Sequence, residues 1–233
     1  MRAVSALARR ADRAPRADYL SLVTHLYRFN RRNAVSLAVV IAAAALLAGC
    51  GLSGETGGRA LRGVKLAQAI PRPDFTLTDT HGQPFDFRAK TDDTVTLLFF
   101  GYLNCPDVCP VHMTNIATVM HGLPYDVTGH VRVVFITTDP ARDTPEKLQA
   151  WLTNFDPSFI GLRGTPEQVK QIETAVKVAP AEPGQPDSSG AYEVGHAAQV
   201  IAFTRDDSAH IVYPFGTRQA DWAHDLPLLV KVQ

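Results

Sequence analysis

The chain has 233 residues, with 23 basic and 23 acidic side chains. Its first 33 residues hold eight Arg and only two acidic residues, so the 184 residues from position 50 onward carry 15 basic and 21 acidic side chains. The negative charge of this larger part argues against nucleic acid as a partner, and its length is enough for one domain with a substantial core.

The N-terminal part has the pattern of an export signal. Its basic segment is followed by an apolar run over residues 34–48, which is short for a membrane span and typical of a signal peptide. Residues 46–50 read Leu-Leu-Ala-Gly-Cys and resemble the bacterial lipobox, in which the Cys is lipidated. We therefore expect a signal peptide of lipoprotein type over residues 1–49, and an exported protein anchored by lipid on Cys50 at the outer face of the cell membrane. An uncleaved anchor helix is the alternative.

The part that follows divides into a tether and a domain. Residues 50–69 are Gly-rich and polar at first, which is typical of a flexible tether. Residues 70–233 are expected to form the folded domain.

The apolar patterns of the domain predict alternating strands and helices. We expect a β-hairpin over residues 75–78 and 84–87, a fully buried strand over 95–100, and an inserted surface loop over 179–191. Two helices have Thr followed by Pro at their starts, a combination that caps the helix and suits its first turn. The further strands are expected at 131–137, 159–162, 197–204 and 210–215, and the helices at 110–123, 144–155, 165–178 and 219–230. This order predicts an α/β fold, a mixed sheet with helices on both faces.

Two cysteines, Cys105 and Cys109, lie between the buried strand 95–100 and the helix expected from residue 110. A strand that leads to a Cys pair at the start of a helix is a thioredoxin-like arrangement, with CxxxC in place of CxxC. The i, i+4 spacing predicts that the two sulfurs meet, either in a disulfide or around one metal ion, and the helix N-terminus favours thiolates. Two buried cysteines that are neighbours by chance are the alternative.

A third metal ligand could come from one of two histidines. His112 follows Cys109 by three residues on the expected helix, whereas His196 lies where a loop meets the strand 197–204. The residues alone leave the choice between them open. Asp139 follows the strand 131–137 in a Thr-Asp-Pro sequence, where it could form a turn or belong to the site.

Four motifs follow one another along the chain. They are Phe-Gly-Tyr-Leu-Asn-Cys-Pro-Asp-Val-Cys-Pro up to Pro110, Thr-Asp-Pro-Ala-Arg-Asp-Thr-Pro-Glu-Lys-Leu at 138–148, Gly-Leu-Arg-Gly-Thr-Pro-Glu-Gln-Val at 161–169, and Val-Gly-His at 194–196. Together they resemble the Sco/SenC family of copper proteins. The resemblance implies a thioredoxin-like fold, and a copper ion, Cu(I) and also Cu(II), bound by Cys105, Cys109 and His196. It also places Asp139 near the site. Gly195 stands where many members have Asp, which puts an acidic partner of the histidine in doubt.

The resemblance implies two functions that use the same residues. The first is a copper metallochaperone that assists assembly of the binuclear copper centre of cytochrome c oxidase, with the copper-site subunit of the oxidase and other copper chaperones as partners. The second is an enzyme, a membrane-tethered thiol–disulfide reductase that uses Cys105 and Cys109 as its redox pair. A peroxidase or redox sensor on the same fold is a third, weaker hypothesis. A copper site needs His196, and a reductase does not.

Overall fold

The computed structural model describes residues 60–232, which belong to one compact unit, Arg59–Gln233. The predicted signal peptide and Cys50 lie outside the described residues. Within residues 60–232, no helix is both long enough and apolar enough to span a bilayer.

Eight strands form one mixed sheet in the order β1-β10-β9-β4-β5-β6-β2-β3, and a two-residue ladder, β7–β8, stands apart from it. Strands β4, β5 and β6 are parallel to one another, and the remaining neighbours in the sheet pair antiparallel. The strands are β1 (Val64–Pro71), β2 (Thr76–Asp79), β3 (Pro84–Asp86), β4 (Val95–Gly101), β5 (Val131–Thr137), β6 (Ile160–Arg163), β7 (Glu182–Pro183), β8 (Val194–Gly195), β9 (Val200–Phe203) and β10 (Ser208–Tyr213). The helices are α2 (Phe87–Lys90), α3 (Val108–Gly122), α4 (Tyr125–Thr128), α5 (Pro145–Thr153), α6 (Pro166–Ala175) and α7 (Gln219–Leu229).

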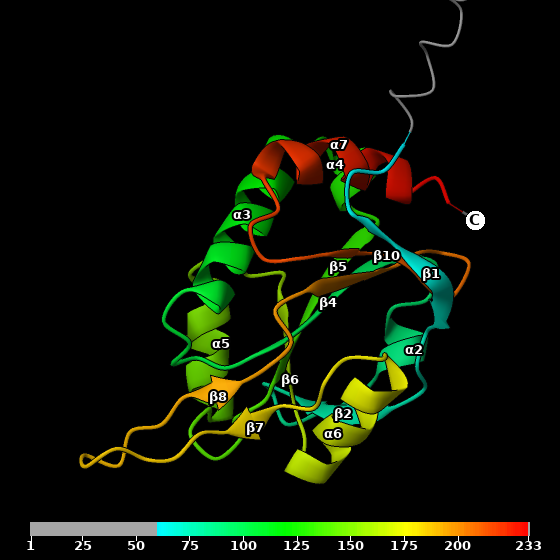
Figure 1. Ribbon diagram of the computed structural model, residues 1–233. Coiled ribbons are helices and arrows are strands. Elements are labelled where there is room, and N and C mark those ends of the chain that lie inside the picture. Colours follow the sequence, from blue (N-terminus) through cyan, green and yellow to red (C-terminus); the bar gives the residue numbers. More distant parts are fainter. Residues whose placement is uncertain (1–59, 233) are drawn as a thin grey trace, which may run out of the picture. The chain divides into compact units, whose positions relative to one another are not determined.

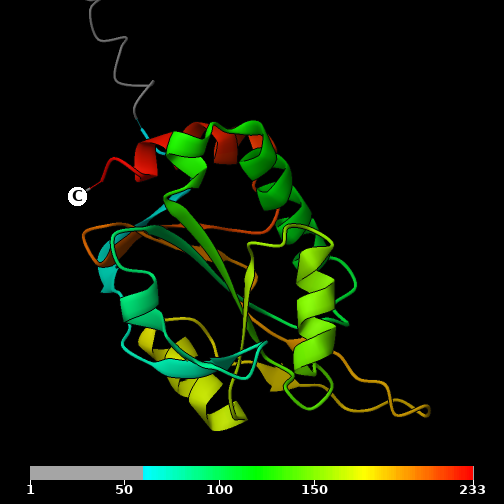
Figure 2. The same cartoon turned by 180° about the vertical axis from the view of Figure 1, so that it is seen from behind.

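Strand β4 lies at the centre of the sheet, and every one of its residues is buried. Side chains alternate between the two faces of a strand, so the strand supplies two cores. Leu97 and Phe99 pack with residues of α3, α5 and α7 on one face. Leu98 and Phe100 pack with residues of α2 and α6 on the other. Figures 1 and 2 show helices covering both faces of the sheet, as predicted.

The two helices with Thr-Pro starts begin where the sequence predicts. The Thr144 side chain accepts a hydrogen bond from the backbone N–H of Lys147 at the start of α5. The Thr165 side chain accepts one from Gln168 N at the start of α6, and the Gln168 side chain accepts one from Thr165 N in return. These caps satisfy backbone donors that would otherwise have no partner in the first turn.

Among the boundaries that differ from the sequence prediction, three have a clear structural reason or bear on the site. Strand β1 begins at Val64, inside the expected tether, because it pairs with β10, and such a long-range pairing has no local sequence signal. The expected surface loop contains β7, which pairs with β8 next to His196. Strand β9 begins only at Val200, so residues 197–199, which were expected in the strand, form part of the loop that carries His196.

A buried arginine, Arg72, connects the start of β4 to the turn after β9, at the end of the sheet opposite the cysteines. The Arg72 side chain is fully buried and donates hydrogen bonds to the carbonyl oxygens of Thr94 and Thr204. It also donates to the Thr91 and Thr96 hydroxyls and to the Asp207 carboxylate. A buried guanidinium is tolerated only with such complete pairing.

We expect the substitution Arg72→Met to lower the free energy of unfolding by about 3 kcal/mol, because the buried carbonyl and hydroxyl groups around it lose their donor. Urea denaturation followed by circular dichroism measures this change. Arg88→Met is the matched control, since Arg88 also pairs with Asp207 but its side chain is 47% exposed. This exposed pair should contribute less than about 1 kcal/mol. Equal effects of the two substitutions would contradict a structural role for burial at Arg72.

Candidate metal centre

The cysteine pair lies where strand β4 ends and helix α3 begins. The helix starts at Val108, two residues before its expected start, so Cys109 is its second residue and Cys105 lies in the turn before it. The two residues nevertheless meet, because Cys109 N donates a hydrogen bond to Cys105 Sγ at 3.4 Å. Both thiols are free and buried, with Cys109 at 0% exposed and Cys105 at 8%.

Gly101, the last residue of β4, leaves room for the Cys109 sulfur. A Cβ atom at this position would lie only 2.6 Å from Cys109 Sγ and 3.0 Å from the Phe135 ring. Side chains do not approach this closely, so any residue larger than glycine would displace the sulfur. The glycine is needed for close packing of strand and helix.

His196 reaches the two sulfurs from a distant part of the chain. Its Nε2 atom lies 3.7 Å from Cys105 Sγ and 3.6 Å from Cys109 Sγ. Its Nδ1 lies 3.0 Å from the carbonyl oxygen of Ala197. Because a carbonyl oxygen can only accept, Nδ1 carries a hydrogen, and Nε2 is the nitrogen that faces the sulfurs.

The three side chains meet the geometric requirement for sharing one ion. The two sulfurs and a ring nitrogen of His196 all lie within 4.8 Å of one another. Ligand atoms bound at about 2.0–2.3 Å to one ion are separated by roughly 3.5–3.8 Å, which matches the two sulfur–nitrogen distances. Within the described part of the chain, no other group of three such side chains comes this close.

His112, the rival ligand, does not join this cluster. It is 2% exposed, and its Nε2 donates a hydrogen bond to the carbonyl oxygen of Ala198 at 2.9 Å. Burial lowers the pKa of His112, which favours the neutral ring. The choice that the residues alone left open therefore falls on His196 by geometry.

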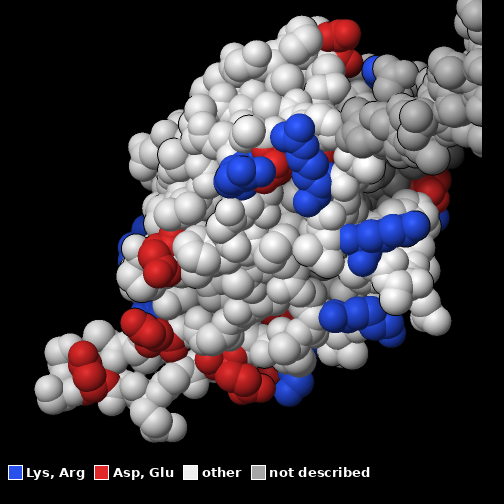
Figure 3. Space-filling view, turned by 45° about the horizontal axis from the view of Figure 1, so that its top comes forward, with Lys and Arg blue, Asp and Glu red and all other residues white. Residues whose placement is uncertain are grey.

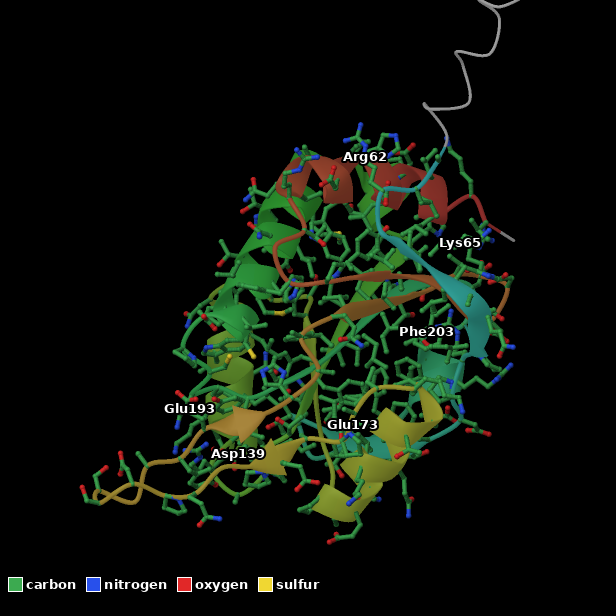
Figure 4. The ribbon with its side chains drawn as sticks, viewed as in Figure 1. Arg62, Lys65, Asp139, Glu173, Glu193 and Phe203 are labelled. Carbon is green, nitrogen blue, oxygen red and sulfur yellow. The ribbon has the colours of Figure 1, made fainter. Side chains whose placement is uncertain are left out.

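Asp139 lies beside the segment that leads to His196, and it is not one of the three clustered residues. Its carboxylate accepts hydrogen bonds from the Arg142 side chain and, at 3.0 Å, from the Tyr192 hydroxyl. The Arg142 guanidinium lies over the Tyr192 ring, 3.6 Å from its centroid. Figure 4 shows Asp139 and Glu193 beside the β7–β8 pair. Asp139 thus holds the chain just before His196, and whether it tunes a bound metal stays a prediction.

The comparisons with known proteins identify the family. The model of the family described as SCO1/SenC matches residues 65–231. The chain belongs to the SCO1/SenC family.

Two curated relatives of this SCO1/SenC chain illustrate the match. A putative copper-binding protein of Stutzerimonas stutzeri is 33% identical over 144 residues, which is 61% of this chain and 69% of that protein. An SCO2-like protein of Rickettsia typhi is 35% identical over 127 residues, which is 53% of this chain and 60% of that protein. The match therefore spans from three fifths to about two thirds of these relatives.

The structure of ScoI from Bradyrhizobium japonicum with copper bound has the same fold. It is 31% identical with a TM-score of 0.60, and the match covers 69% of this chain and 99% of that one. The predicted thioredoxin-like α/β fold is thereby confirmed.

The sequence analysis missed Asp143, a residue that lies near Cys105 and Cys109. It is 1% exposed and accepts hydrogen bonds from the Thr137 hydroxyl at 2.5 Å and from the backbone N–H of Leu103 at 3.2 Å. It therefore ties the turn before Cys105 to the end of β5. Burial raises the pKa of this carboxyl group. The one available signal was its place in the Thr-Asp-Pro-Ala-Arg-Asp motif.

The surroundings of the site are acidic on one side. The chain from residue 178 to 204 contains Glu182, Asp187 and Glu193 but no Lys or Arg. Strands β7 and β8 and the residues between them form a projecting hairpin. Figure 3 shows acidic side chains on and beside this hairpin, whereas most Lys and Arg side chains visible on this face lie away from it. Acidic side chains on the segment that leads to His196 favour the approach of cations to this side of the domain.

The pKa values of the two thiols are shifted in opposite directions. The hydrogen bond from the Cys109 thiol lowers the pKa of Cys105 to about 4, although burial opposes this, and contact with His196 acts in the same direction. The same hydrogen bond, together with burial, raises the pKa of Cys109 above its usual range. At neutral pH the pair therefore holds one proton, on Cys109, and one thiolate, on Cys105.

We expect the metal-free protein to keep the Cys105 thiolate down to a pH of about 4, because its pKa is lowered from a usual value near 9. The thiolate is present above this pH and is lost as the pH falls through it. Ultraviolet absorbance of the thiolate measures the titration. Cys109→Ala should raise the midpoint by about 1–3 pH units, because it removes the donor to the sulfur. An unchanged midpoint in Cys109→Ala would mean that another group stabilises the thiolate.

Proposed function

We propose that this protein binds copper through Cys105, Cys109 and His196 and delivers it during assembly of the binuclear copper centre of cytochrome c oxidase. The observation that carries the proposal is the meeting of two thiol sulfurs and one imidazole nitrogen within 4.8 Å. These three groups come from a turn, a helix and a distant loop. A structural core does not require two thiols and an imidazole to meet in this way, whereas a metal site does.

The donor set suits copper better than the other common ions. Soft thiolates favour Cu(I), and imidazole suits copper in either oxidation state. A structural zinc site normally has four protein ligands, and only three side chains converge here. The copper named in the descriptions of the Stutzerimonas and Bradyrhizobium proteins supports the same choice.

Each ligand has a defined role in binding. Cys105 is already a thiolate at neutral pH, so it is suited to contact the incoming ion first. Cys109 must release its proton to become a ligand, so copper binding is expected to release a proton. The hydrogen bond from His196 Nδ1 to Ala197 fixes the ring so that Nε2 presents its lone pair to the ion.

The assembly role is supported by the family. BsSco, which shares 16% identity with a TM-score of 0.56, is described as a member of the Sco family of cytochrome c oxidase assembly proteins. We propose the copper-site subunit of the oxidase as the partner, with copper chaperones as the source of the ion. The acidic hairpin beside the site would favour a partner surface that carries Lys or Arg.

A thiol–disulfide reductase is the second candidate, favoured by the two adjacent free thiols. In this reaction the Cys105 thiolate attacks a target disulfide, forms a mixed disulfide and releases one target thiolate. Cys109 then loses its proton and attacks the Cys105 sulfur, which releases the second target thiolate and leaves a Cys105–Cys109 disulfide. The target gains two electrons, and the pair loses two. His196 is not required for these steps.

We expect wild-type protein to bind one copper ion per chain, and Cys105→Ser or Cys109→Ser to abolish tight binding, because each removes one of two thiolates. His196→Ala should weaken copper affinity by more than the roughly 10–100-fold typical of a residue that only supports a ligand. Competition with a copper chelator measures these affinities. His210→Ala serves as the control, since His210 pairs with Asp206 and is not part of the cluster.

The same His196→Ala variant separates the two candidate functions. It should keep a dithiol that cycles between reduced and oxidised states, because exchange needs only the two sulfurs. Impaired oxidase maturation in cells that produce this variant would support copper delivery. Normal maturation would favour the reductase, and wild-type copper affinity in the variant would overturn the three-ligand site.

For localisation, we propose that the mature protein begins at lipidated Cys50 and is anchored at the outer face of the cell membrane. The support is the apolar run that ends in Leu-Ala-Gly-Cys. Mass spectrometry of membrane-extracted protein should find an N-terminal diacylated Cys50. Cys50→Ala should leave the signal uncleaved and the chain without a lipid anchor. An intact, unmodified N-terminus in the wild type would instead support the anchor helix.

A further inference from the structure

The loop that carries His196 is not held by strand pairing at His196 itself, where the position of the ring nitrogen matters most. Residues 196–199 lie between β8 and β9 and belong to neither strand. Yet a preorganised metal site needs each ligand atom held within about 0.5 Å of its place, and this applies to His196 Nε2 near the two sulfurs. Contacts outside the sheet ladder therefore fix this segment.

His112 supplies such a contact from the helix that carries the cysteine. Its Nε2 donates to the carbonyl oxygen of Ala198 at 2.9 Å, two residues after His196. His112 lies one turn after Cys109 on α3, so one rigid element holds both the sulfur and the anchor of the opposite loop. One turn of α3 therefore carries Cys109 at one end and, at the other, His112, which holds the loop of His196 at a fixed distance.

Aromatic packing keeps the His112 ring in place. Its centroid lies 5.1 Å from the Phe99 ring and 5.9 Å from the Phe215 ring. The same Phe99 ring lies 5.8 Å from the His196 ring, which meets it edge to face. The two histidines therefore pack on one ring from β4, and a shift of His112 would be passed to His196.

We infer that His112 is a positioning residue for the metal centre, which fixes His196 by a hydrogen bond to Ala198 and is not itself a ligand. This inference rests on the proposed copper site. His112 has its Nε2 engaged with the backbone and is not among the three clustered ligands. In this respect it resembles the supporting groups that orient metal-binding histidines, although it acts through the backbone and not on the ring.

Two substitutions separate the hydrogen bond from the packing. His112→Phe keeps an aromatic ring against Phe99 but loses the donor, and we expect it to weaken copper affinity about 10–100-fold. His112→Gln keeps an N–H group at nearly the same distance from the backbone, and its affinity should stay within about threefold of wild type, since the bond to Ala198 is retained. His121→Phe is the matched control on the same helix, because its side chain is 61% exposed.

Two spectroscopic readouts detect positioning itself. In the metal-free protein, nitrogen NMR of the His196 ring should show greater mobility in His112→Phe than in wild type or His112→Gln. In the copper-loaded protein, the sulfur-to-copper charge-transfer bands should shift in His112→Phe alone. A loss of stability without these changes would mean that His112 only fills the core.

The failure of this inference can be distinguished from failure of the copper site. If His196→Ala has no effect on copper affinity, the site itself is wrong. If His196→Ala weakens binding but His112→Phe leaves affinity, bands and ring mobility unchanged, only the role of His112 is overturned. If His112→Phe does not fold, His112→Gln and His112→Asn decide, because both carry an amide but only Gln reaches Ala198. Equal affinities of these two variants would contradict the inference.

Discussion

The close approach of helix α3 to the end of strand β4 is the constraint on which the site depends. Gly101 leaves just enough space for the Cys109 sulfur, which is fully buried between strand and helix. Strand β4 is itself fixed by two cores, because its side chains alternate between the two faces of the sheet. The sulfur position is therefore determined by a fully buried part of the molecule, where close packing leaves little room for movement.

The other two clustered side chains, Cys105 and His196, are held with less packing and more hydrogen bonding. Cys105 lies in a turn that Asp143 ties to β5 through Leu103 N, and His196 lies in a loop tied through Ala198 to α3. The fully buried Cys109 is held by packing, whereas Cys105 and His196 are held mainly through hydrogen bonds of their neighbouring residues. Such a difference suits a protein that must hold an ion and also give it up.

The local elements could be predicted from sequence, and the long-range ones could not. The buried run of β4, the Thr-Pro helix starts and the Cys pair each have a signal within a few neighbouring residues. The histidine that meets Cys105 and Cys109 has no such local signal. The residues alone leave both His112 and His196 possible, and the choice depends on the fold, which places His112 against Ala198. The resemblance to the Sco/SenC motifs pointed to His196, and the geometry agrees. Asp143 and strand β1 were missed because their roles depend on residues far away in the chain.

The buried Asp225 on α7 has a mechanical consequence. Its carboxylate accepts hydrogen bonds from the backbone N–H groups of Arg62 and Gly63 and from the Tyr213 hydroxyl. The first residues of the domain are thus clamped to its last helix and to β10. Tension applied along the chain before Arg62 first meets this clamp and the β1–β10 pairing, and neither of them includes Cys105, Cys109 or His196. A pull on the N-terminal side of the domain is therefore taken up first by contacts that involve none of the three clustered side chains.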